Sequence, residues 1–148
     1  MFRHILIPTD GSPVAKKAVK AGIAIARQLG AKVTGCYVIE AMQPHIYGEG
    51  YLIRNREIVR TYEKGAREVA EREINSMGVV ATTAGVPFSG VVTISDTPYM
   101  GIVDTAKKHK CDAIFMASHG RNAVAGLVLG SVTQKVVVHS KVPVLVYR

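Results

Sequence analysis

A short apolar run, a glycine-rich segment and a new helical pattern follow one another between residues 112 and 135, and they constrain the fold most strongly. Residues 113–117 are long enough for a buried strand and too short for a helix. Residues 118–130 are a predicted loop with three glycines, and Ser131 opens the helical pattern. This combination favours an anion site, because glycines let backbone N–H groups approach a ligand and a helix start supplies free N–H donors. The alternative is a tight connection that needs glycines only for its turns.

The start of this last helical pattern has a capping signature, whereas the common phosphate signatures are missing. Ser131 and Gln134 have the spacing of a capping box, in which the serine accepts a bond from a free N–H and the glutamine reaches back. The sequence contains no Gly-x-x-x-x-Gly-Lys-Ser/Thr, and no Gly-x-Gly-x-x-Gly opens a helix after a strand. An ordinary P-loop and a dinucleotide fingerprint are therefore both excluded.

The rest of the chain alternates between predicted strands and helices. Ser12 and Pro13 predict a capped helix start, Gly30 and Gly78 predict helix ends, and residues 41–53 predict a loop. The predicted strands are 4–9, 32–39, 91–94, 113–117 and 142–147, and the predicted helices are 13–29, 54–77, 97–110 and 131–140. Short apolar strands separated by helices indicate an α/β fold with an open, doubly wound parallel sheet covered on both faces.

Length and composition restrict the class of protein. A chain of 148 residues with 48% apolar residues predicts a single domain, 1–148, with a substantial core. The formal charge of +8 suits an anionic partner, but aromatic residues are 6%, tryptophan is absent and no block of five basic residues occurs, so nucleic acid is an unlikely partner. No apolar stretch approaches the ~20 residues of a membrane span, and the run at residues 5–7 is too short for a signal peptide. We expect a cytoplasmic protein.

The chain has two cysteines and five histidines, the residue types that most often bind zinc. Cys36 and Cys111 lie far apart, so buried free thiols in a reducing compartment are expected. The histidines show no paired metal spacing with one another or with the cysteines, so no structural zinc site is expected.

Residues 117–131 resemble the nucleotide loop of the universal stress protein family, whose pattern is Gly, two residues, Gly, nine residues, Gly, then Ser or Thr. Gly120, Gly130 and Ser131 fit this pattern, whereas Ala117 occupies the place of the first glycine. Residues 5–12, 37–39 and 142–147 agree with the family as well. The resemblance covers nearly the whole chain and is weakest at residues 41–60. The family has members that bind ATP and members that do not.

The resemblance implies a Rossmann-like, adenine nucleotide alpha hydrolase-like sheet of order 3-2-1-4-5. In such sheets ligands bind at the carboxyl ends of the strands, at the switch point between strands 1 and 4. Asp10 and the glycine loop would then face one crevice. The matching positions imply ATP, with magnesium or manganese, held by Pro8, Thr9, Asp10, Val38, Met116, Ala117, His119, Gly120, Arg121, Gly130, Ser131 and Val132.

Each of these roles has a structural alternative. Asp10 would accept hydrogen bonds from ribose or adenine, or it could serve only as a turn residue. Val38 would offer main-chain groups to adenine, although its side chain alone favours a plain core position. Met116 would pack on the base or ribose, and a core methionine is an equal alternative. Arg121 would reach the outer phosphates, or be merely solvated. His119 is only weak evidence for a catalytic base.

The loop positions would hold the phosphate chain. Gly120, Gly130, Ser131 and Val132 would do so through backbone N–H groups and the serine hydroxyl, and Ser131 could instead act only as a helix cap. Ala117 could crowd the ligand or force an unfavourable backbone angle, or be tolerated if its φ is negative. We expect this alanine to weaken ATP affinity without abolishing it.

Together these inferences predict a small ATP-binding stress-response protein that acts as a dimeric, nucleotide-dependent regulatory module. The alternatives are a slow ATP hydrolase on the same fold and a nucleotide-free interaction protein. The alternating apolar residues of Val142–Tyr147, followed only by Arg148, predict a homodimer through this edge strand. The sequence names no protein client and no inducing stress. Residues 48–60 would shield the nucleotide pocket as a lid, an expectation that rests only on their position in the sequence.

Overall fold

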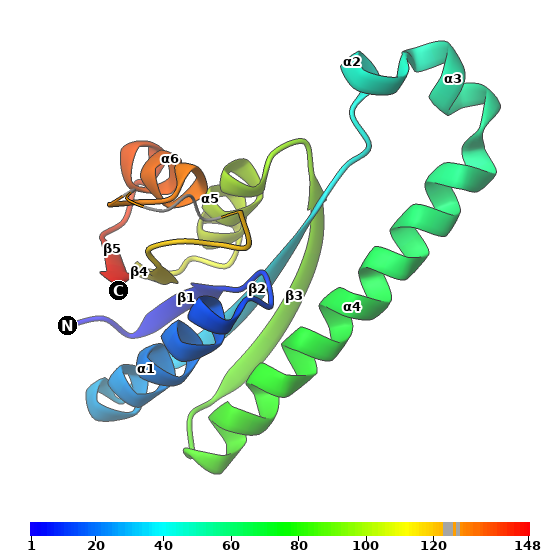
Figure 1. The fold of residues 1–148 in the computed structure, drawn as a ribbon. Coiled ribbons are helices and arrows are strands. Elements are labelled where there is room, and N and C mark those ends of the chain that lie inside the picture. The colour runs from blue at the N-terminus through cyan, green and yellow to red at the C-terminus, as the bar shows by residue number, and fades with distance from the viewer. Residues whose placement is uncertain (123–125, 127) are drawn as a thin grey trace.

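A computed structural model of the chain describes residues 1–122, 126 and 128–148 (Figure 1). Its elements, in chain order, are β1 (His4–Pro8), α1 (Pro13–Leu29), β2 (Lys32–Glu40), α2 (Pro44–Tyr47), α3 (Glu49–Arg54), α4 (Arg56–Thr83), β3 (Phe88–Ser95), α5 (Pro98–Lys108), β4 (Ala113–Ala117), α6 (Ser131–His139) and β5 (Val144–Tyr147). Part of the predicted glycine loop, residues 123–125 and 127, lies outside the described residues.

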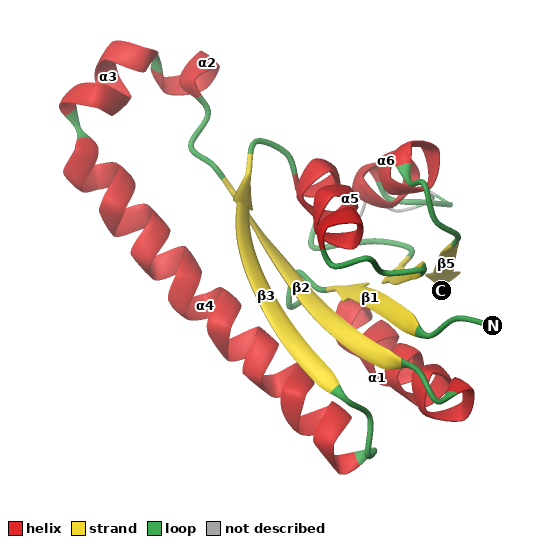
Figure 2. Ribbon diagram, turned by 180° about the vertical axis from the view of Figure 1, so that it is seen from behind, coloured by secondary structure: helices red, strands yellow, loops and turns green. Residues whose placement is uncertain are grey.

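The five strands form one parallel sheet of order β3-β2-β1-β4-β5, which confirms the predicted fold and strand order. Helices α1 and α4 cover one face, and α5 and α6 cover the other (Figures 1 and 2). Neighbouring strand residues therefore point into two different cores. Ile7 packs into the α1–α4 core and Leu6 into the α5–α6 core, and both are 0% exposed. This burial on both faces explains the continuous apolar runs of the strands.

Helix α1 begins and ends as the sequence predicts. The Ser12 hydroxyl oxygen accepts a bond of 3.2 Å from the Ala15 N–H, and Pro13 occupies the first helical position. Gly30 ends the helix in a left-handed conformation with φ 64°. These local signals fix where the chain turns back toward β2.

The segment after β2 differs from the prediction. Residues 41–53, expected as a loop, contain the short helices α2 and α3, which project beyond the sheet with the first turns of α4 (Figure 1). The projecting part exposes apolar side chains, including Ile58 and Tyr62.

Helix α4 also does not end at Gly78, as predicted, but continues to Thr83. A Cβ at Gly78 would lie 3.4 Å from the Phe88 ring, which is ordinary van der Waals contact, so this position faces β3 without requiring glycine. Met77 and Ala81 are buried on either side of it. Their burial outweighs the roughly 1 kcal/mol that a glycine costs inside a helix.

Within the described residues, no helix combines the length and the apolar character that crossing a membrane requires.

Both cysteines are buried free thiols, as expected. Burial raises the pKa of Cys36 and of Cys111 to about 11 in each case. Because the thiolate is the reactive form, we expect both cysteines to react slowly with an aromatic disulfide reagent at pH 8 and quickly after unfolding in guanidinium. A time course of absorbance in the folded and unfolded protein measures this difference. Equal rates in the two states would contradict the prediction.

Candidate functional site

Three hydrogen bonds hold the turn after β1 and fix the position of Asp10. The Thr9 N–H donates to the Cys36 carbonyl over 2.8 Å, and the Thr9 hydroxyl oxygen accepts from the Gly11 N–H over 3.1 Å. The Asp10 Oδ1 accepts from the Ser12 N–H over 2.9 Å. Gly11 has φ 78°, which only glycine adopts without strain. Backbone geometry therefore fixes the Asp10 carboxylate at the carboxyl end of β1.

The second carboxylate oxygen of Asp10 contacts the glycine loop. Its Oδ2 accepts a bond of 2.8 Å from the Arg121 N–H, which is 111 residues away in the sequence. A Cβ at Gly120 would lie 2.6 Å from the same oxygen, so a larger residue there would displace the carboxylate. The structure thus brings the β1 turn and the glycine loop together beyond the carboxyl ends of β1 and β4, at the switch point of the sheet, and this region is called the crevice below.

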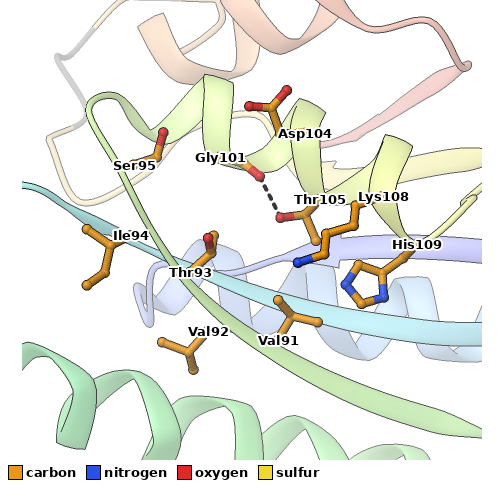
Figure 3. A pocket seen from close by; sticks show the side chains of 10 residues that line it. All are labelled: Val91, Val92, Thr93, Ile94, Ser95, Gly101, Asp104, Thr105, Lys108 and His109. Atoms are coloured by element: carbon orange, nitrogen blue, oxygen red, sulfur yellow. Dashed lines mark hydrogen bonds between the residues drawn. The ribbon is translucent and has the colours of Figure 1, made fainter.

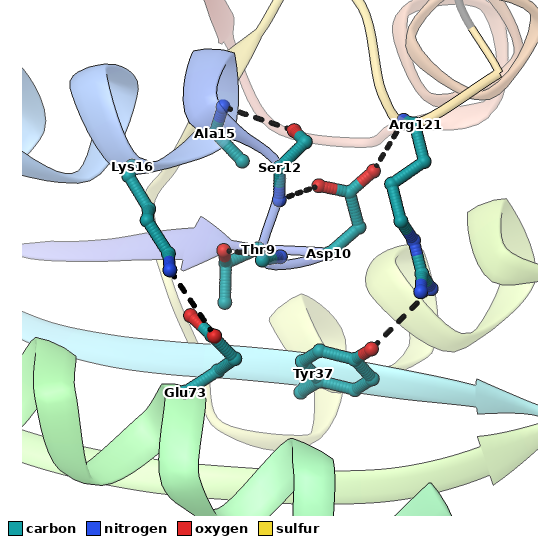
Figure 4. Close-up of polar contacts among 9 residues, drawn as sticks. Thr9, Asp10, Ser12, Ala15, Lys16, Tyr37, Glu73 and Arg121 are labelled. Carbon is teal, nitrogen blue, oxygen red and sulfur yellow. Dashed lines mark hydrogen bonds and ion pairs between the residues drawn. The ribbon is translucent and has the colours of Figure 1, made fainter.

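Arg121 crosses this crevice. Its exposed side chain donates from Nη2 to the Tyr37 hydroxyl over 3.3 Å, so it lies above the end of β2 (Figure 4). The guanidinium is therefore held over the carboxyl ends of β1 and β2. A guanidinium here offers a fork of N–H donors to an anionic group that enters the crevice.

The two ends of the glycine loop meet in a narrow neck. The Gly130 N–H donates to the Ser118 carbonyl over 2.7 Å, and the Ser118 N–H donates to the Tyr147 carbonyl over 2.7 Å. A Cβ at Gly130 would lie 3.3 Å from both the His119 Cα and the Ser118 carbonyl oxygen, which are backbone atoms. The neck therefore leaves little room for a side chain at position 130. His119 hydrogen-bonds through Nδ1 to the Ser118 hydroxyl over 2.9 Å.

The start of α6 corrects the predicted capping box. Gly130 is the N-cap, with an extended backbone of φ −68° and ψ 155°, and no side chain bonds to this cap. Ser131 is instead the first helical residue, and its side chain is exposed. The first bond of the helix runs from the Gln134 N–H to the Gly130 carbonyl over 2.9 Å. The serine is thus not a cap, and its hydroxyl is available to a ligand.

Three backbone N–H groups consequently lack a helical partner at this end of α6, those of Ser131, Val132 and Thr133. No acidic residue occupies the first turn. The Thr133 hydroxyl donates to the Ala117 carbonyl over 2.9 Å and so fixes the helix start against the end of β4. Free N–H groups and the positive end of the helix dipole together favour an anion at this position.

The main-chain groups of Val38 face the side of β2 on which β1 lies. Alternate residues of β2 point toward β1, and the Cys36 carbonyl is bonded by Thr9. Val38 points the same way, two residues on, where β1 has already ended at Pro8. Its side chain packs against α5, since a Cβ at Gly101 would lie 2.6 Å from the Val38 Cγ1. The side chain therefore belongs to the core, and only the main chain faces the β1 side of β2.

Two of the proposed site residues lie in the cores. Met116 is 5% exposed within the α5–α6 core. Ala117 is 6% exposed within the α1–α4 core, and its φ is not positive. Ala117 therefore carries no strain from a positive φ, and its methyl group packs in the core. Our expectation that this alanine weakens the site has no support in the geometry.

We now expect Ala117→Gly to leave ATP affinity within about twofold, because the lost methyl group faces the core. The variant should instead lose roughly 1 kcal/mol of folding free energy, since glycine is unfavourable in a strand and leaves a small void. Calorimetric titration with ATP and urea unfolding measure the two quantities. A tenfold gain in ATP affinity would show that the methyl group crowds the ligand after all.

Sequence reasoning missed three residues that shape the site. Tyr37 holds Arg121, Ser118 closes the neck, and Thr133 ties α6 to β4. Tyr37 and Arg121 are 84 residues apart, and no spacing pattern joins them. The role of Thr133 could have been predicted in part, because a threonine in the first turn of a helix commonly bonds a nearby main-chain group.

The fold and this crevice define the class of doubly wound α/β proteins, in which ligands bind where the strand order reverses. A sequence model of the universal stress protein family matches residues 1–148. The chain therefore belongs to the universal stress protein family. A relative from Thermus aquaticus, the universal stress protein in the QAH/OAS sulfhydrylase 3' region, is 31% identical over 100% of both chains.

Solved structures agree with this assignment. Protein MJ0577 is 27% identical, with a TM-score of 0.83 over 99% of this chain and 95% of its own. A universal stress protein in complex with cAMP is 21% identical, with a TM-score of 0.70 over 99% of this chain and 97% of its own. One from Archaeoglobus fulgidus in complex with dAMP is 15% identical, with a TM-score of 0.63 over 100% of this chain and 98% of its own. The last two likenesses show the fold.

Proposed function

We propose that this protein is an ATP-binding stress-response module whose output depends on whether the crevice holds nucleotide. The observation that supports it most directly is the meeting of Asp10 with the glycine loop, through the 2.8 Å bond to the Arg121 N–H. That contact joins the turn after β1 to the loop that leads into α6. Asp10 offers an acceptor for a nucleoside, and the start of α6 offers N–H donors for phosphates.

The nucleoside end of the proposed site is formed by Asp10 and Val38. Each Asp10 carboxylate oxygen accepts one backbone N–H. A carboxylate oxygen has two lone pairs, so it can accept a ribose hydroxyl as well. The main-chain groups of Val38 lie beyond the end of β1, where the edge of an adenine ring can pair with them. This pairing is the source of the preference for adenine that we propose.

The phosphate end is formed by the loop and α6. The N–H groups of Ser131 and Val132 and the exposed Ser131 hydroxyl face the anion, and the Arg121 guanidinium neutralises its outer charge. A magnesium or manganese ion would enter with the phosphates and stay bound mainly to them. The chemistry that this ion supplies is charge neutralisation of the phosphate chain.

Identification of the ligand that co-purifies with the protein tests the proposal. Native mass spectrometry followed by denaturing liquid chromatography should find an adenine nucleotide at near one equivalent. Titration of stripped protein with ATP, GTP and tripolyphosphate should rank ATP first. Equal affinity for ATP and GTP would refute the adenine contact, and the absence of binding to all three would refute the site.

We also propose that the protein acts as a homodimer through β5. This strand is one edge of the sheet and pairs only with β4 among the described strands. The carbonyls of Pro143 and Tyr147 face β4, so the N–H and C=O groups of Val144 and Val146 face outward. A second β5 related by a two-fold axis would satisfy these groups and cover the half-buried side chains.

Val144→Lys should therefore raise the dimer dissociation constant at least tenfold while ATP affinity stays within about twofold, because a charge at the paired edge opposes its copy. Light scattering across micromolar concentrations measures the dimer, and titration with ATP measures the site. Lys141→Glu, a charge change outside the strand, is the control. A wild-type protein that is monomeric at these concentrations would contradict the prediction.

A further inference from the structure

The opposite edge of the sheet, β3, is also open, and the structure shows which of its groups are unpaired (Figure 2). The carbonyls of Pro87 and Ser95 accept bonds from the N–H groups of Val33 and Ala41, so the odd-numbered residues of β3 point their main chain toward β2. Because a strand alternates, the even-numbered residues point away from the sheet. The main chains of Phe88, Gly90, Val92 and Ile94 consequently lack a strand partner.

A cavity of about 170 Å³ lies between this edge and α5 (Figure 3). Val91 and Thr93 point toward α5, whereas Val92 points to the other face (Figure 3). The helix lines the opposite wall with Asp104, Thr105, Lys108 and His109. The open edge therefore runs beside a hollow that can accept side chains from a neighbouring strand.

The two ends of this cavity differ in charge. Lys108 and His109 lie beside Val91, whereas Asp104 lies farther along α5, nearer Ser95 (Figure 3). Lys108 and Asp104 are both exposed and are not joined by an ion pair in the described structure. An acidic side chain beside Val91 would thus meet a cation without first breaking an existing ion pair.

From this arrangement we propose that the β3 edge binds an extended peptide with an acidic side chain, which adds to the sheet as a sixth strand. The main chain of the peptide pairs with Gly90, Val92 and Ile94. Every second side chain of the peptide enters the cavity under α5, and the acidic one lies against Lys108. Strand addition of this kind takes affinity from the main chain and selectivity from alternate side chains.

The charge of the molecule favours an acidic peptide as the occupant of the β3 edge. The formal charge of +8 attracts an acidic segment, and Lys108 places one positive charge at the cavity. The surface is also distinct from the nucleotide crevice, because it involves β3 and α5 rather than the ends of β1 and β4. It gives the family fold a separate means of engaging a protein client.

A selection from a phage-displayed library of random nonapeptides tests the proposal. Enriched sequences should share β-branched residues and one acidic position. Synthetic peptides of the enriched sequence, with Glu, Gln or Lys at that position, are then compared by fluorescence polarisation, and affinity should fall in that order. Failure to enrich any sequence above background would overturn the proposal.

Two matched pairs of variants locate the binding surface. Ile94→Pro removes an outward N–H and leaves the hydrogen bonds between β3 and β2 in place, so the affinity for the Glu peptide should fall at least tenfold. Ile94→Thr keeps this N–H, and its affinity should stay within about threefold of wild type. Lys108→Glu should reverse the order of the Glu and Lys peptides, and Lys107→Glu, on the same helix but outside the cavity, should not. If Ile94→Pro does not fold, the comparison of Lys108→Glu with Lys107→Glu tests the proposal by itself.

The contrary outcomes are equally specific. A folded Ile94→Pro that binds the Glu peptide normally would place the peptide elsewhere. If Lys108→Glu still binds the Glu peptide more tightly than the Lys peptide, the acidic side chain does not lie against Lys108. A concentration-dependent dimer that Ile94→Pro abolishes would show that a second copy, and not a peptide, occupies the edge.

Discussion

Gly130→Val should lower ATP affinity at least 100-fold, the largest effect we expect from a single substitution. A Cβ at this position would lie 3.3 Å from two backbone atoms of the neck, and a branched side chain adds further atoms there. Backbone atoms cannot swing aside as a flexible side chain can, so the neck must open and the first N–H groups of α6 move away from the phosphates. The reason is crowding and not backbone angle, because φ at Gly130 is −68°.

Calorimetric titration with ATP measures this loss, and thermal unfolding without ligand reports whether the variant still folds. Gly65→Val is the matched control, because a Cβ at Gly65 in α4 meets nothing within 4 Å. The control should bind ATP within about twofold of wild type. A folded Gly130→Val with normal ATP affinity would show that the neck is not part of the phosphate site.

Asp10→Ala should lower ATP affinity by roughly 10–100-fold, the range that follows from losing a hydrogen bond of about 1.5–3 kcal/mol to a charged group. The variant should bind tripolyphosphate almost as well as wild type does, because the proposed phosphate contacts lie at the other end of the crevice. The preference for ATP over GTP should shrink at the same time. Titrations with the three ligands under one salt condition separate these effects.

Asp10 has a second role that the experiment must distinguish. Its carboxylate also accepts the N–H groups of Ser12 and Arg121, so its loss loosens the glycine loop. Asp10→Asn keeps one side-chain oxygen and serves as the intermediate variant. If both variants lose ATP and tripolyphosphate binding equally, Asp10 acts only by holding the loop, and the proposed nucleoside contact is wrong.

Local signals predicted the parts of the site that depend on neighbouring residues. Ser12 and Pro13 start α1, and residues 113–117 form a buried strand, because capping and burial patterns act within a few residues. The strand order came from the family resemblance, and that order placed Asp10 beside the glycine loop. The crevice was therefore predictable as a location.

The errors arose where packing at a distance overrode local preference. Gly78 was expected to end α4, but the burial of Met77 and Ala81 carries the helix onward. The capping box at Ser131 failed because Gly130 adopts the extended N-cap conformation itself. The bond between Tyr37 and Arg121 depends on the folded sheet, and no local pattern encodes it.

The neck between Ser118 and Gly130 has a consequence for how this protein could be altered. The 2.7 Å bond joins the two ends of the loop, and Arg121 ties its first part to Asp10 and Tyr37. A replacement segment of different length after Arg121 would cost little, since doubling the length of a flexible loop adds only about 0.6 kcal/mol of closure entropy. The sequence from 122 to 129 is therefore the exchangeable part of the loop. A new ligand preference could be grafted onto this scaffold through these residues without redesign of its core.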